Sequence, residues 1–332
     1  MQGKRRIGYC LGFLGFLGLI LAAAKWHLDQ TFFPPYEPSL PLNVRVLETT
    51  ERDGFKELRF TFEGLQGESV PAVLALPEGD GPYPCVLYLH ELGEEKEQAE
   101  ILMPRFTEAG YAVSSFDQLT RGERQLSEED IPKLLLSLRN RSRYTVIEAR
   151  RIIDYLQTRP DIAGDRIYMV GGSFGAMSSA IVASMDERPK AVVMAHGGAN
   201  LSKVLSGPEI KRQAGPIYWP ARLLIHYFLS VADPAKYVGA ISPRPVLFIN
   251  GKTDIVITLD AANAFFDAAN EPKERLLYEG PHIGEDPEEI PMLIEDALAF
   301  IERQDSKVTG LSLPEATSAS PVHPWQGGRE CT

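Results

Sequence analysis

Apolar and polar positions alternate along this chain in two rhythms. Residues 85–89, Cys-Val-Leu-Tyr-Leu, are almost wholly apolar, as is typical of strands buried on both faces of a parallel sheet. Residues 144–158 instead carry apolar side chains three and four positions apart, which predicts an amphipathic helix. The same patterns, and the turn residues between them, predict strands at residues 44–50, 57–63, 70–76, 85–89, 111–116, 166–170, 191–195, 245–249 and 276–278.

Helical spacing recurs at residues 97–109, 144–158, 259–269 and 288–302, and a further helix is predicted to follow Ser173. The first strands are joined by a turn at Asp53-Gly54, and strand–helix units follow. This order predicts an α/β fold of the α/β-hydrolase type, with a mostly parallel central sheet and helices on both faces. Ligands of such sheets bind at the carboxyl ends of the strands.

The N-terminus carries a candidate membrane or export segment. Lys4, Arg5 and Arg6 precede an uncharged run from Ile7 to Ala24, which is just long enough to cross a bilayer. Residues 1–25 are therefore interpreted as a signal anchor or a cleaved signal peptide, and a buried core helix stays open as a third reading. The basic cluster places the rest of the chain on the extracytoplasmic side, anchored to the membrane or secreted.

The amino-acid composition divides the rest of the chain into three segments. Residues 26–42 are rich in proline, which predicts an extended linker. Residues 43–305 form the predicted catalytic domain, and residues 198–234 within it are long enough for a small cap. Residues 306–332 are rich in Ser, Thr, Gly and Pro and are predicted to be a disordered tail.

Charge and cysteine content narrow the range of possible partners and cofactors. The formal net charge is −11, so a nucleic acid is not a predicted partner. The three cysteines have neither the spacing of a zinc site nor that of a disulfide framework. No metal or cofactor is predicted, and the oligomeric state is left open.

Residues 171–175, Gly-Gly-Ser-Phe-Gly, match the Gly-x-Ser-x-Gly pattern. The pattern is short, but here it follows a predicted strand and precedes a predicted helix, as a nucleophile elbow requires. Such a turn exposes the serine hydroxyl at a helix N-terminus. Ser173 is the predicted nucleophile, and a glycine-rich helix cap is the alternative.

A serine needs a base, and in this architecture the acid and then the histidine follow the nucleophile in the chain. Asp254 comes after the strand at residues 245–249, and His282 follows the strand that ends at Tyr278. We predict Asp254 as the acid and His282 as the base. His196 and Asp260 are the rival candidates.

The oxyanion of the reaction needs fixed donors. We predict the backbone N–H of Phe174 and that of Glu91 or Leu92, in the loop after residue 89. A solvent-facing turn at His90-Glu91 is the alternative. His90 and His196, both following strands, are predicted to lie at the substrate pocket.

These residues resemble those of the dienelactone hydrolase, acetyl xylan esterase and prolyl-oligopeptidase-like branch of the α/β-hydrolases. The resemblance covers roughly residues 70–302. It is carried by Ala-Arg-Arg-Ile-Ile-Asp-Tyr-Leu at 149–156, Arg-Pro-Asp at 159–161, Asp-Arg-Ile at 165–167, the elbow, Arg121-Gly122, and the Ser-Pro-Arg-Pro-Val-Leu run at 242–247 that leads to Asp254. The resemblance implies Ser173, Asp254 and His282 as the catalytic triad.

The sequence departs from that family at Glu91, where glycine is common. A carboxylate would oppose an oxyanion, so we expect Glu91 to point outward. Dienelactone hydrolases themselves use cysteine, so their activity is not implied.

The predicted cap contains a strongly apolar and aromatic stretch. Tyr218 and Trp219 are predicted to line an acyl pocket, and an ordinary core helix is the alternative. The basic run of Arg139, Arg141 and Arg143 is interpreted as a solvated turn.

Together these features predict a serine esterase that acts on small-molecule esters through an acyl-enzyme. A serine peptidase or amidase with the same triad remains an alternative. So does a catalytically inactive, membrane-tethered binding protein on the same fold.

Overall fold

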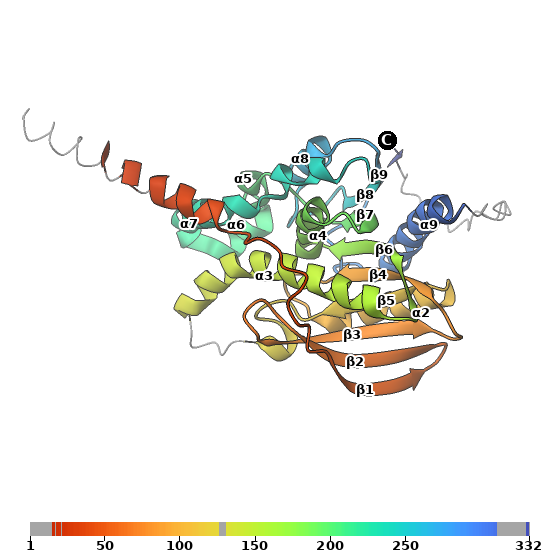
Figure 1. The fold of residues 1–332 in the computed structure, drawn as a ribbon. Helices are drawn as coiled ribbons and strands as arrows, with labels where there is room; N and C mark the ends of the chain where they lie inside the picture. The colour runs from red at the N-terminus through yellow and green to blue at the C-terminus, as the bar shows by residue number, and fades with distance from the viewer. Residues whose placement is uncertain (1–14, 17, 21, 126–130, 311–329, 332) are drawn as a thin grey trace, which may run out of the picture. The chain divides into compact units, whose positions relative to one another are not determined.

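The computed structural model describes residues 15–16, 18–20, 22–125, 131–310 and 330–331 (Figure 1). They fall into two units, Met1–Glu37 and Pro38–Thr332. In the first unit, residues 22–30 form a helix in which Lys25 pairs with Asp29 one turn away. The helix therefore extends into the segment predicted as an extended linker, because the first proline comes only at Pro34.

Most of the predicted membrane or signal run, residues 7–24, lies outside the described residues. Among the residues that are described, no helix combines the length and the hydropathy needed to span a bilayer.

The second unit is built on a sheet whose described strands run in the order β1-β2-β3-β5-β4-β6-β7-β8-β9-β10. Neighbours from β5 to β9 pair in parallel, whereas β1, β2, β3 and β10 join antiparallel. The predicted α/β-hydrolase fold is confirmed. The strands are β1 Arg45–Arg52, β2 Phe55–Glu63, β3 Ser69–Pro77, β4 Tyr83–Leu89, β5 Ala112–Phe116, β6 Ile162–Gly172, β7 Pro189–Ala195, β8 Val246–Gly251, β9 Lys273–Tyr278 and β10 Glu330–Cys331.

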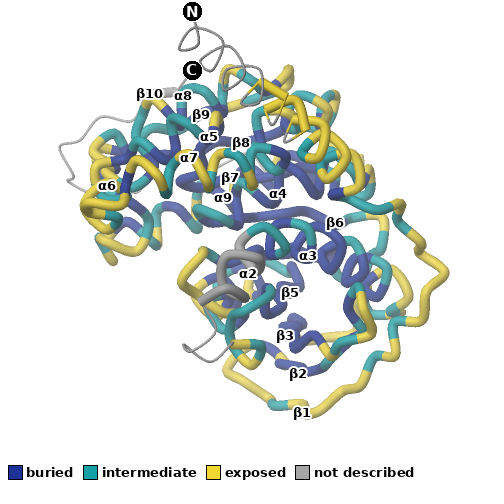
Figure 2. The backbone as a smooth tube through the Cα atoms, turned by 90° about the vertical axis from the view of Figure 1, so that its left-hand side faces the viewer, coloured by how far each residue is buried: buried dark blue, intermediate teal, exposed yellow. Residues whose placement is uncertain are grey.

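Burial follows the position of each strand in the sheet. β4, β5 and β8 are almost wholly buried, whereas the edge strand β1 is exposed along most of its length (Figure 2). The apolar runs of the sequence therefore mark the central strands, as expected for strands covered on both faces.

Helices cover both faces of this sheet (Figure 1). α2 and α9 share one core cluster with alternate residues of the strands, which includes Val86 of β4, Val193 of β7 and Phe300 of α9. α3 and α4 pack on the opposite face, where α4 contacts β6 and β7. The helices are α2 Met103–Glu108, α3 Ile131–Thr158, α4 Phe174–Met185, α5 Leu201–Val204, α6 Pro208–Ala214, α7 Tyr218–Leu229, α8 Leu259–Ala268 and α9 Ile290–Thr309, with short 3-10 turns that include Lys96–Ile101 and Gly122–Arg124.

Two helices differ from the prediction. The segment at residues 97–109 is a 3-10 turn followed by α2, and Pro104 stands in the first turn of α2, where it is tolerated. At its other end, α9 continues to Thr309, past the predicted start of the tail at residue 306. Residues 311–329 of that tail lie outside the described residues.

α3 also corrects the interpretation of the basic run. It begins at Ile131, so Arg139, Arg141 and Arg143 lie within a helix and not on a solvated turn. Arg141 is 2% exposed, and Thr145 and Glu148 on the same stripe are 0% exposed. The inward face thus continues in polar residues, which a count of apolar positions cannot detect.

The predicted cap corresponds to α5, α6 and α7, inserted between β7 and β8. Asp233 accepts the backbone N–H groups of Asn200 and Leu201 at 3.0 and 2.7 Å, and that of Ala235 at 3.1 Å. One carboxylate therefore joins the two ends of the insertion.

Candidate active site

Ser173 stands alone between β6 and α4 in a strained conformation. Its φ of 50° is unusual for a residue with a side chain, and its N–H donates to the carbonyl of Ala195 at 2.8 Å. The flanking glycines permit this turn. A Cβ on Gly175 would lie 1.9 Å from the carbonyl oxygen of Leu89, and one on Gly171 would lie 2.4 Å from the backbone of Gly175.

The three residues predicted as a triad lie within hydrogen-bond distance of one another. His282, in the loop after β9, has its Nε2 2.9 Å from Ser173 Oγ. Its Nδ1 lies 2.6 Å from Oδ2 of Asp254, which follows β8. Asp254 and His282 are 5% and 8% exposed. Three loops at the carboxyl edge of the sheet therefore bring together side chains that are far apart in sequence.

Asp254 is held from two further directions. Its Oδ1 accepts the N–H groups of Val256 and Ile257, both at 2.8 Å. Burial alone would raise the pKa of Asp254, but hydrogen bonds from His196 and His282, with the backbone donors, lower it to about 2. The carboxylate is therefore ionised at neutral pH.

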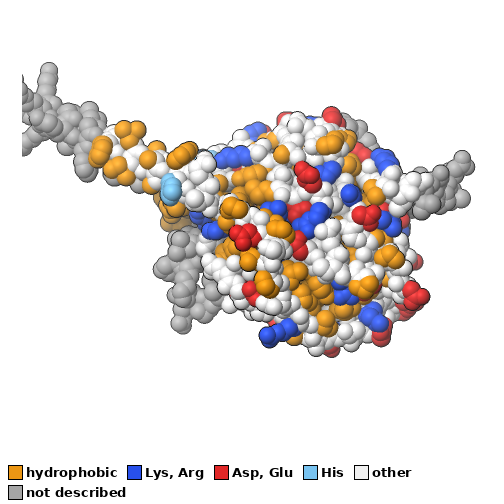
Figure 3. Space-filling view, in the orientation of Figure 1, with side chains coloured by type: hydrophobic (Ala, Val, Ile, Leu, Met, Phe, Trp, Pro, Cys, Tyr) orange, Lys and Arg blue, Asp and Glu red, His pale blue; other side chains and the backbone are white. Residues whose placement is uncertain are grey.

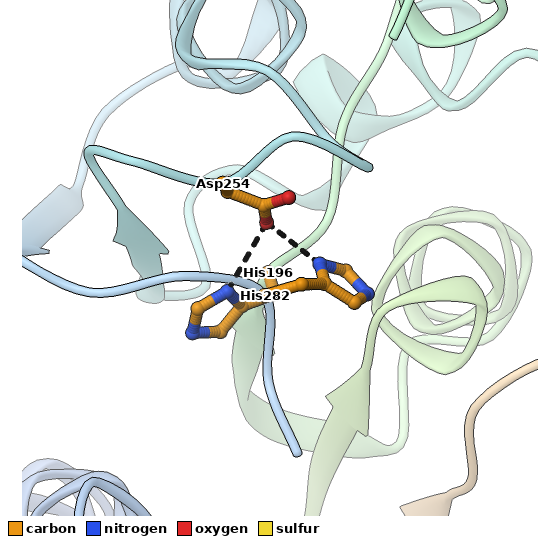
Figure 4. Close-up of side chains that lie close together, drawn as sticks. All are labelled: His196, Asp254 and His282. Carbon is orange, nitrogen blue, oxygen red and sulfur yellow. Dashed lines mark hydrogen bonds and ion pairs between the residues drawn. The ribbon is translucent and has the colours of Figure 1, made fainter. Parts of the chain in front are cut away.

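His196, the rival base, lies beside His282, and both rings approach the same oxygen of Asp254 (Figure 4). Its Nδ1 is 3.3 Å from Asp254 Oδ2, and its ring stands at 89° to that of His282. It is completely buried, and burial lowers its pKa although Asp254 raises it. His282, and not His196, reaches Ser173.

The ligand atoms of His196, Asp254 and His282 lie within 4.8 Å of one another, a spacing that could suit a metal ion. Both imidazoles already share Oδ2 of Asp254 as their acceptor. Hydrogen bonding therefore accounts for this group without an ion.

The loop after β4 contains His90, which is fully buried. Its Nε2 accepts the N–H of Gln118 at 3.2 Å, so Nδ1 carries the proton and donates to the carbonyl of Glu91 at 2.8 Å. Burial lowers the pKa of His90 to about 3. The prediction that His90 lies at the substrate pocket is wrong, because it shapes the loop from within.

Glu91 also differs from expectation. Its N–H donates to Oε1 of Gln98 at 3.1 Å, and its own Oε1 accepts from Nε2 of Gln98 at 2.7 Å. The side chain lines the cavity at Ser173 and does not point outward, and burial raises its pKa although Gln98 opposes this. Leu92, by contrast, has no recorded acceptor for its N–H among the described residues.

A cavity of about 420 Å³ opens at Ser173 and His282. Its described lining is mostly apolar and includes Leu92, Phe174, Met177, Ile181, Leu201, Val204, Leu205, Ile210, Ile225, Leu229, Val256 and Ile257. α4, α7 and the segment around α5 supply most of these side chains, so the insertion does cover the site.

Tyr218 and Trp219 do not line this cavity. Tyr218 is buried and donates its hydroxyl to the carbonyl of Leu205 at 3.1 Å, whereas Trp219 is 64% exposed. Both belong to a separate hollow on the cap with Arg222. The prediction of an aromatic acyl pocket is therefore wrong. His196, also predicted at the pocket, is fully buried and is not among the described residues that line the cavity.

Sequence reasoning missed two side chains at the site. Gln98 clamps Glu91, and Arg141 lines the cavity while donating from Nη1 to the carbonyl of Leu92 at 2.9 Å. Neither carries a motif. The helical register of Arg141 with Thr145 and Glu148 is the one signal that could have placed Arg141 inward.

The profile of the dienelactone hydrolase family matches residues 70–271 of this chain. Over 232 residues the chain is 25% identical to YtaP of Bacillus subtilis (strain 168), which is named as a hydrolase; the match covers 64% of this chain and 75% of that protein. It is 26% identical over 156 residues to the esterase EstD of Thermotoga maritima, covering 46% of this chain and 35% of that protein.

Among solved structures, the fold is similar to that of an acetyl xylan esterase from Paenibacillus sp. R4. The TM-score is 0.66 at 18% identity, and the match covers 83% of this chain and 98% of that chain. At this identity the likeness concerns the fold.

Proposed function

Because this chain belongs to the dienelactone hydrolase family of hydrolases, we propose that it is a serine esterase that cleaves carboxylic esters through an acyl-enzyme. The observation that carries the proposal is the continuous hydrogen-bond chain from Ser173 Oγ through His282 to Asp254, at 2.9 and 2.6 Å. A serine hydroxyl in contact with a base that a carboxylate orients is an activated nucleophile.

In the first step His282 Nε2 takes the proton of Ser173 as Oγ attacks the ester carbonyl. Asp254 orients the imidazole through Nδ1 and stabilises the imidazolium that forms. His282 then gives the proton to the alkoxy oxygen, the C–O bond breaks, and the alcohol leaves. A water molecule, deprotonated by His282, hydrolyses the acyl-enzyme and restores Ser173.

We assign the oxyanion donors to the backbone N–H groups of Phe174 and Leu92. Phe174 is the first residue of α4, where N–H groups have no intrahelical partner and the helix dipole favours negative charge. Glu91 is the less suitable donor, because its N–H is already bonded to Gln98. The proposal therefore selects Leu92 of the two residues predicted for this role.

A small-molecule carboxylic ester is the proposed substrate. The lining beside Ser173 is mainly apolar, which suits the carbon chain of an acyl group. A relative in sequence that is named as an esterase supports the same reaction class.

The test is hydrolysis of p-nitrophenyl acetate, butyrate and octanoate by the full chain and by Ser173→Ala. We expect Ser173→Ala to lower kcat at least about 1,000-fold, since the nucleophile is lost. Ser184→Ala, on the same helix with its hydroxyl bonded to the carbonyl of Ile181, is the matched control and keeps wild-type rates.

Turnover by Ser173→Ala equal to that of the wild type would refute the mechanism. Matched ester and anilide substrates separate an esterase from a peptidase or amidase, because both reactions use the same triad. A phosphonate probe that fails to label a folded wild-type protein would favour the inactive binding protein.

A further inference from the structure

The cap helix α7 is apolar on the side that faces away from the protein. Leu223 is 72% exposed, Trp219 is 64% exposed, and Ile217, just before the helix, is 65% exposed. Leu224 and Phe228 are exposed as well. Trp219 and Leu223 stand four residues apart, as do Leu224 and Phe228, so each pair lies along one side of the helix. These five side chains form the α7 face.

Such a concentration of exposed apolar side chains occurs once in the described part of the second unit. Elsewhere in that part, large apolar residues are exposed singly, as at Leu92 and Ile255, or as the pair Val46-Leu47 on the edge strand β1. On the outer face that Figure 3 draws, charges of both signs are interspersed with apolar side chains. A contiguous apolar surface on a folded domain is typical of a place where a partner binds.

The inner side of α7 is already covered by the protein. Ile225 and Leu229 line the cavity at Ser173, and the hydroxyl of the buried Tyr218 donates to the carbonyl of Leu205 at 3.1 Å. A helix that is apolar all round is normally covered all round. Since the α7 face is exposed among the described residues, a partner on that side would complete the cover.

The charges around the α7 face are positive. Between Glu209 and Asp233 the sequence has no acidic residue, but it includes Lys211, Arg212 and Arg222. Arg212 pairs with Glu209, whereas no carboxylate of the described residues pairs with Lys211 or Arg222. The whole chain has a net charge of −11, so this stretch is basic within an acidic protein. The charge therefore complements a partner that carries negative charge.

An open hollow of about 560 Å³ adjoins the α7 face, and Lys211, Trp219 and Arg222 are among the residues that line it. The guanidinium of Arg222 stands 5.7 Å from the ring centroid of Trp219, and its Nη2 donates to the carbonyl of Ser202 at 3.1 Å. Its buried Nε has no partner among the described residues. Tryptophan rings and basic side chains are both favoured at the level of phospholipid headgroups, so the hollow matches that environment.

We propose that the α7 face binds to an anionic lipid surface. Leu223 and Leu224 enter the boundary between headgroups and acyl chains, and Trp219 lies at the level of the headgroups. Lys211 and Arg222 bind the lipid phosphates. A second copy of this chain is a poorer partner, because a symmetric contact would bring the same cations together. The inference goes beyond the proposed esterase function, since no residue of the triad takes part.

The test uses Trp219 as the reporter in the full chain. The other two tryptophans are Trp26 and Trp325, so the double variant Trp26→Phe, Trp325→Phe leaves Trp219 alone. Vesicles of equimolar phosphatidylcholine and phosphatidylglycerol should shift its emission to the blue, and brominated acyl chains should quench it, because the ring enters the interface. Vesicles of phosphatidylcholine alone should need about tenfold more lipid for the same shift, because they lack the negative charge.

In this background, Leu223→Glu places a charge in the middle of the α7 face and should remove both the shift and the quenching. Leu47→Glu, which changes a leucine that is 62% exposed on β1, is the matched control and should keep both. Absence of quenching before any further change overturns the proposal. Quenching that persists in Leu223→Glu also overturns it, since the predicted membrane segment at residues 7–24 would then suffice to hold the chain on the vesicle.

If Leu223→Glu does not fold, Lys211→Glu at an exposed position decides. It should raise the lipid requirement for the anionic vesicles and leave that for phosphatidylcholine unchanged; no change for either contradicts the proposal. A blue shift that grows with protein concentration in the absence of lipid overturns it in favour of a second copy. The lipid response should be the same with Ser173→Ala, so a failure of the esterase function is distinguishable from a failure of lipid binding.

Discussion

His196 shares one oxygen of Asp254 with His282, and the two rings stand edge to face with centroids 5.5 Å apart. Burial favours the neutral imidazole, so Nδ1 of His196 carries the proton that Asp254 accepts. Its Nε2 has no partner among the described atoms. A neutral donor orients Asp254 without neutralising it, which leaves the full negative charge for the imidazolium of His282. His196 is therefore a positioning residue.

We expect His196→Asn to lower kcat/KM about tenfold, because Asp254 loses one of its donors. Asparagine tolerates the φ of 52° at this position, so the backbone is preserved. Asp254→Asn should cost far more, about 1,000-fold to 10,000-fold, since the base loses its orienting charge. Steady-state kinetics on p-nitrophenyl butyrate measure both variants. A His196→Asn enzyme within twofold of the wild type would contradict the assignment.

Among the elements, the cap has its two ends joined by one side chain, that of Asp233. Asp233 binds backbone N–H groups at both ends of the insertion that carries α5, α6 and α7. α7 has one side toward the cavity, through Ile225 and Leu229, and leaves Leu223 72% exposed on the other. Asp233 thus joins the two ends of the insertion, and Val204 of α5 packs on Ile257 and Ala261 outside it.

Asp233→Ala should loosen the cap. Three backbone donors lose their acceptor, so we expect faster proteolytic cleavage within residues 201–232 and a several-fold higher KM for p-nitrophenyl octanoate. Mass spectrometry of limited digests locates the cuts. Asp260→Ala, which removes an exposed pair with Lys203, is the control and should leave the digestion pattern unchanged. Identical digestion of Asp233→Ala and the wild type would show that Asp233 does not hold the cap in place.

Part of the arrangement of strands and helices could be predicted from the sequence. Central strands such as β4 were predicted because burial on both faces demands a continuous apolar run. The part of α3 around Arg141 was missed because its inward stripe is polar and depends on partners such as Gln118, which lies far away in sequence. The periodicity of apolar residues indicates which positions are buried among apolar side chains, but it does not indicate which positions form buried hydrogen bonds.

The residues of the candidate site also differ in how far the sequence could predict their positions. Chain order was enough to select Ser173, Asp254 and His282, because the fold fixes which strand ends lie together. The pocket was predicted wrongly at Tyr218 and Trp219, because apolar character does not say which side of a cap helix faces inward. The choice of Leu92 over Glu91 depends on a hydrogen bond to Gln98 that no local pattern contains.

For the whole molecule, the buried histidines contribute to the response to acid. Burial lowers the pKa of His90 to about 3 and also lowers that of His196, so both are neutral in the folded protein. An unfolded histidine takes up a proton below about pH 6.5. The contribution of these histidines to stability is therefore full above pH 6.5 and decreases as the pH falls from 6.5 toward 3, whereas burial raises the pKa of Glu148 to about 7 and acts in the opposite direction. Asp254, with a pKa of about 2, adds a further loss below about pH 4.

Thermal unfolding between pH 7.5 and pH 4.5 tests this expectation. His90 alone should contribute a loss on the order of 2 kcal/mol at pH 4.5, because the unfolded chain is protonated there and the folded one is not. His90→Gln should show a shallower dependence on pH, even if it is less stable at pH 7.5. The same dependence on pH in His90→Gln and in the wild type would refute the contribution of His90.

The order in which the site residues occur along the chain has a consequence for biosynthesis. A ribosome releases Ser173 well before Asp254 and His282, and β8 and β9, which precede the acid and the base, pair only after β7 has emerged. Until residue 282 has left the exit tunnel, the serine is an ordinary alcohol with no base beside it. The proposed esterase activity can thus begin only when the C-terminal half has been made and has folded.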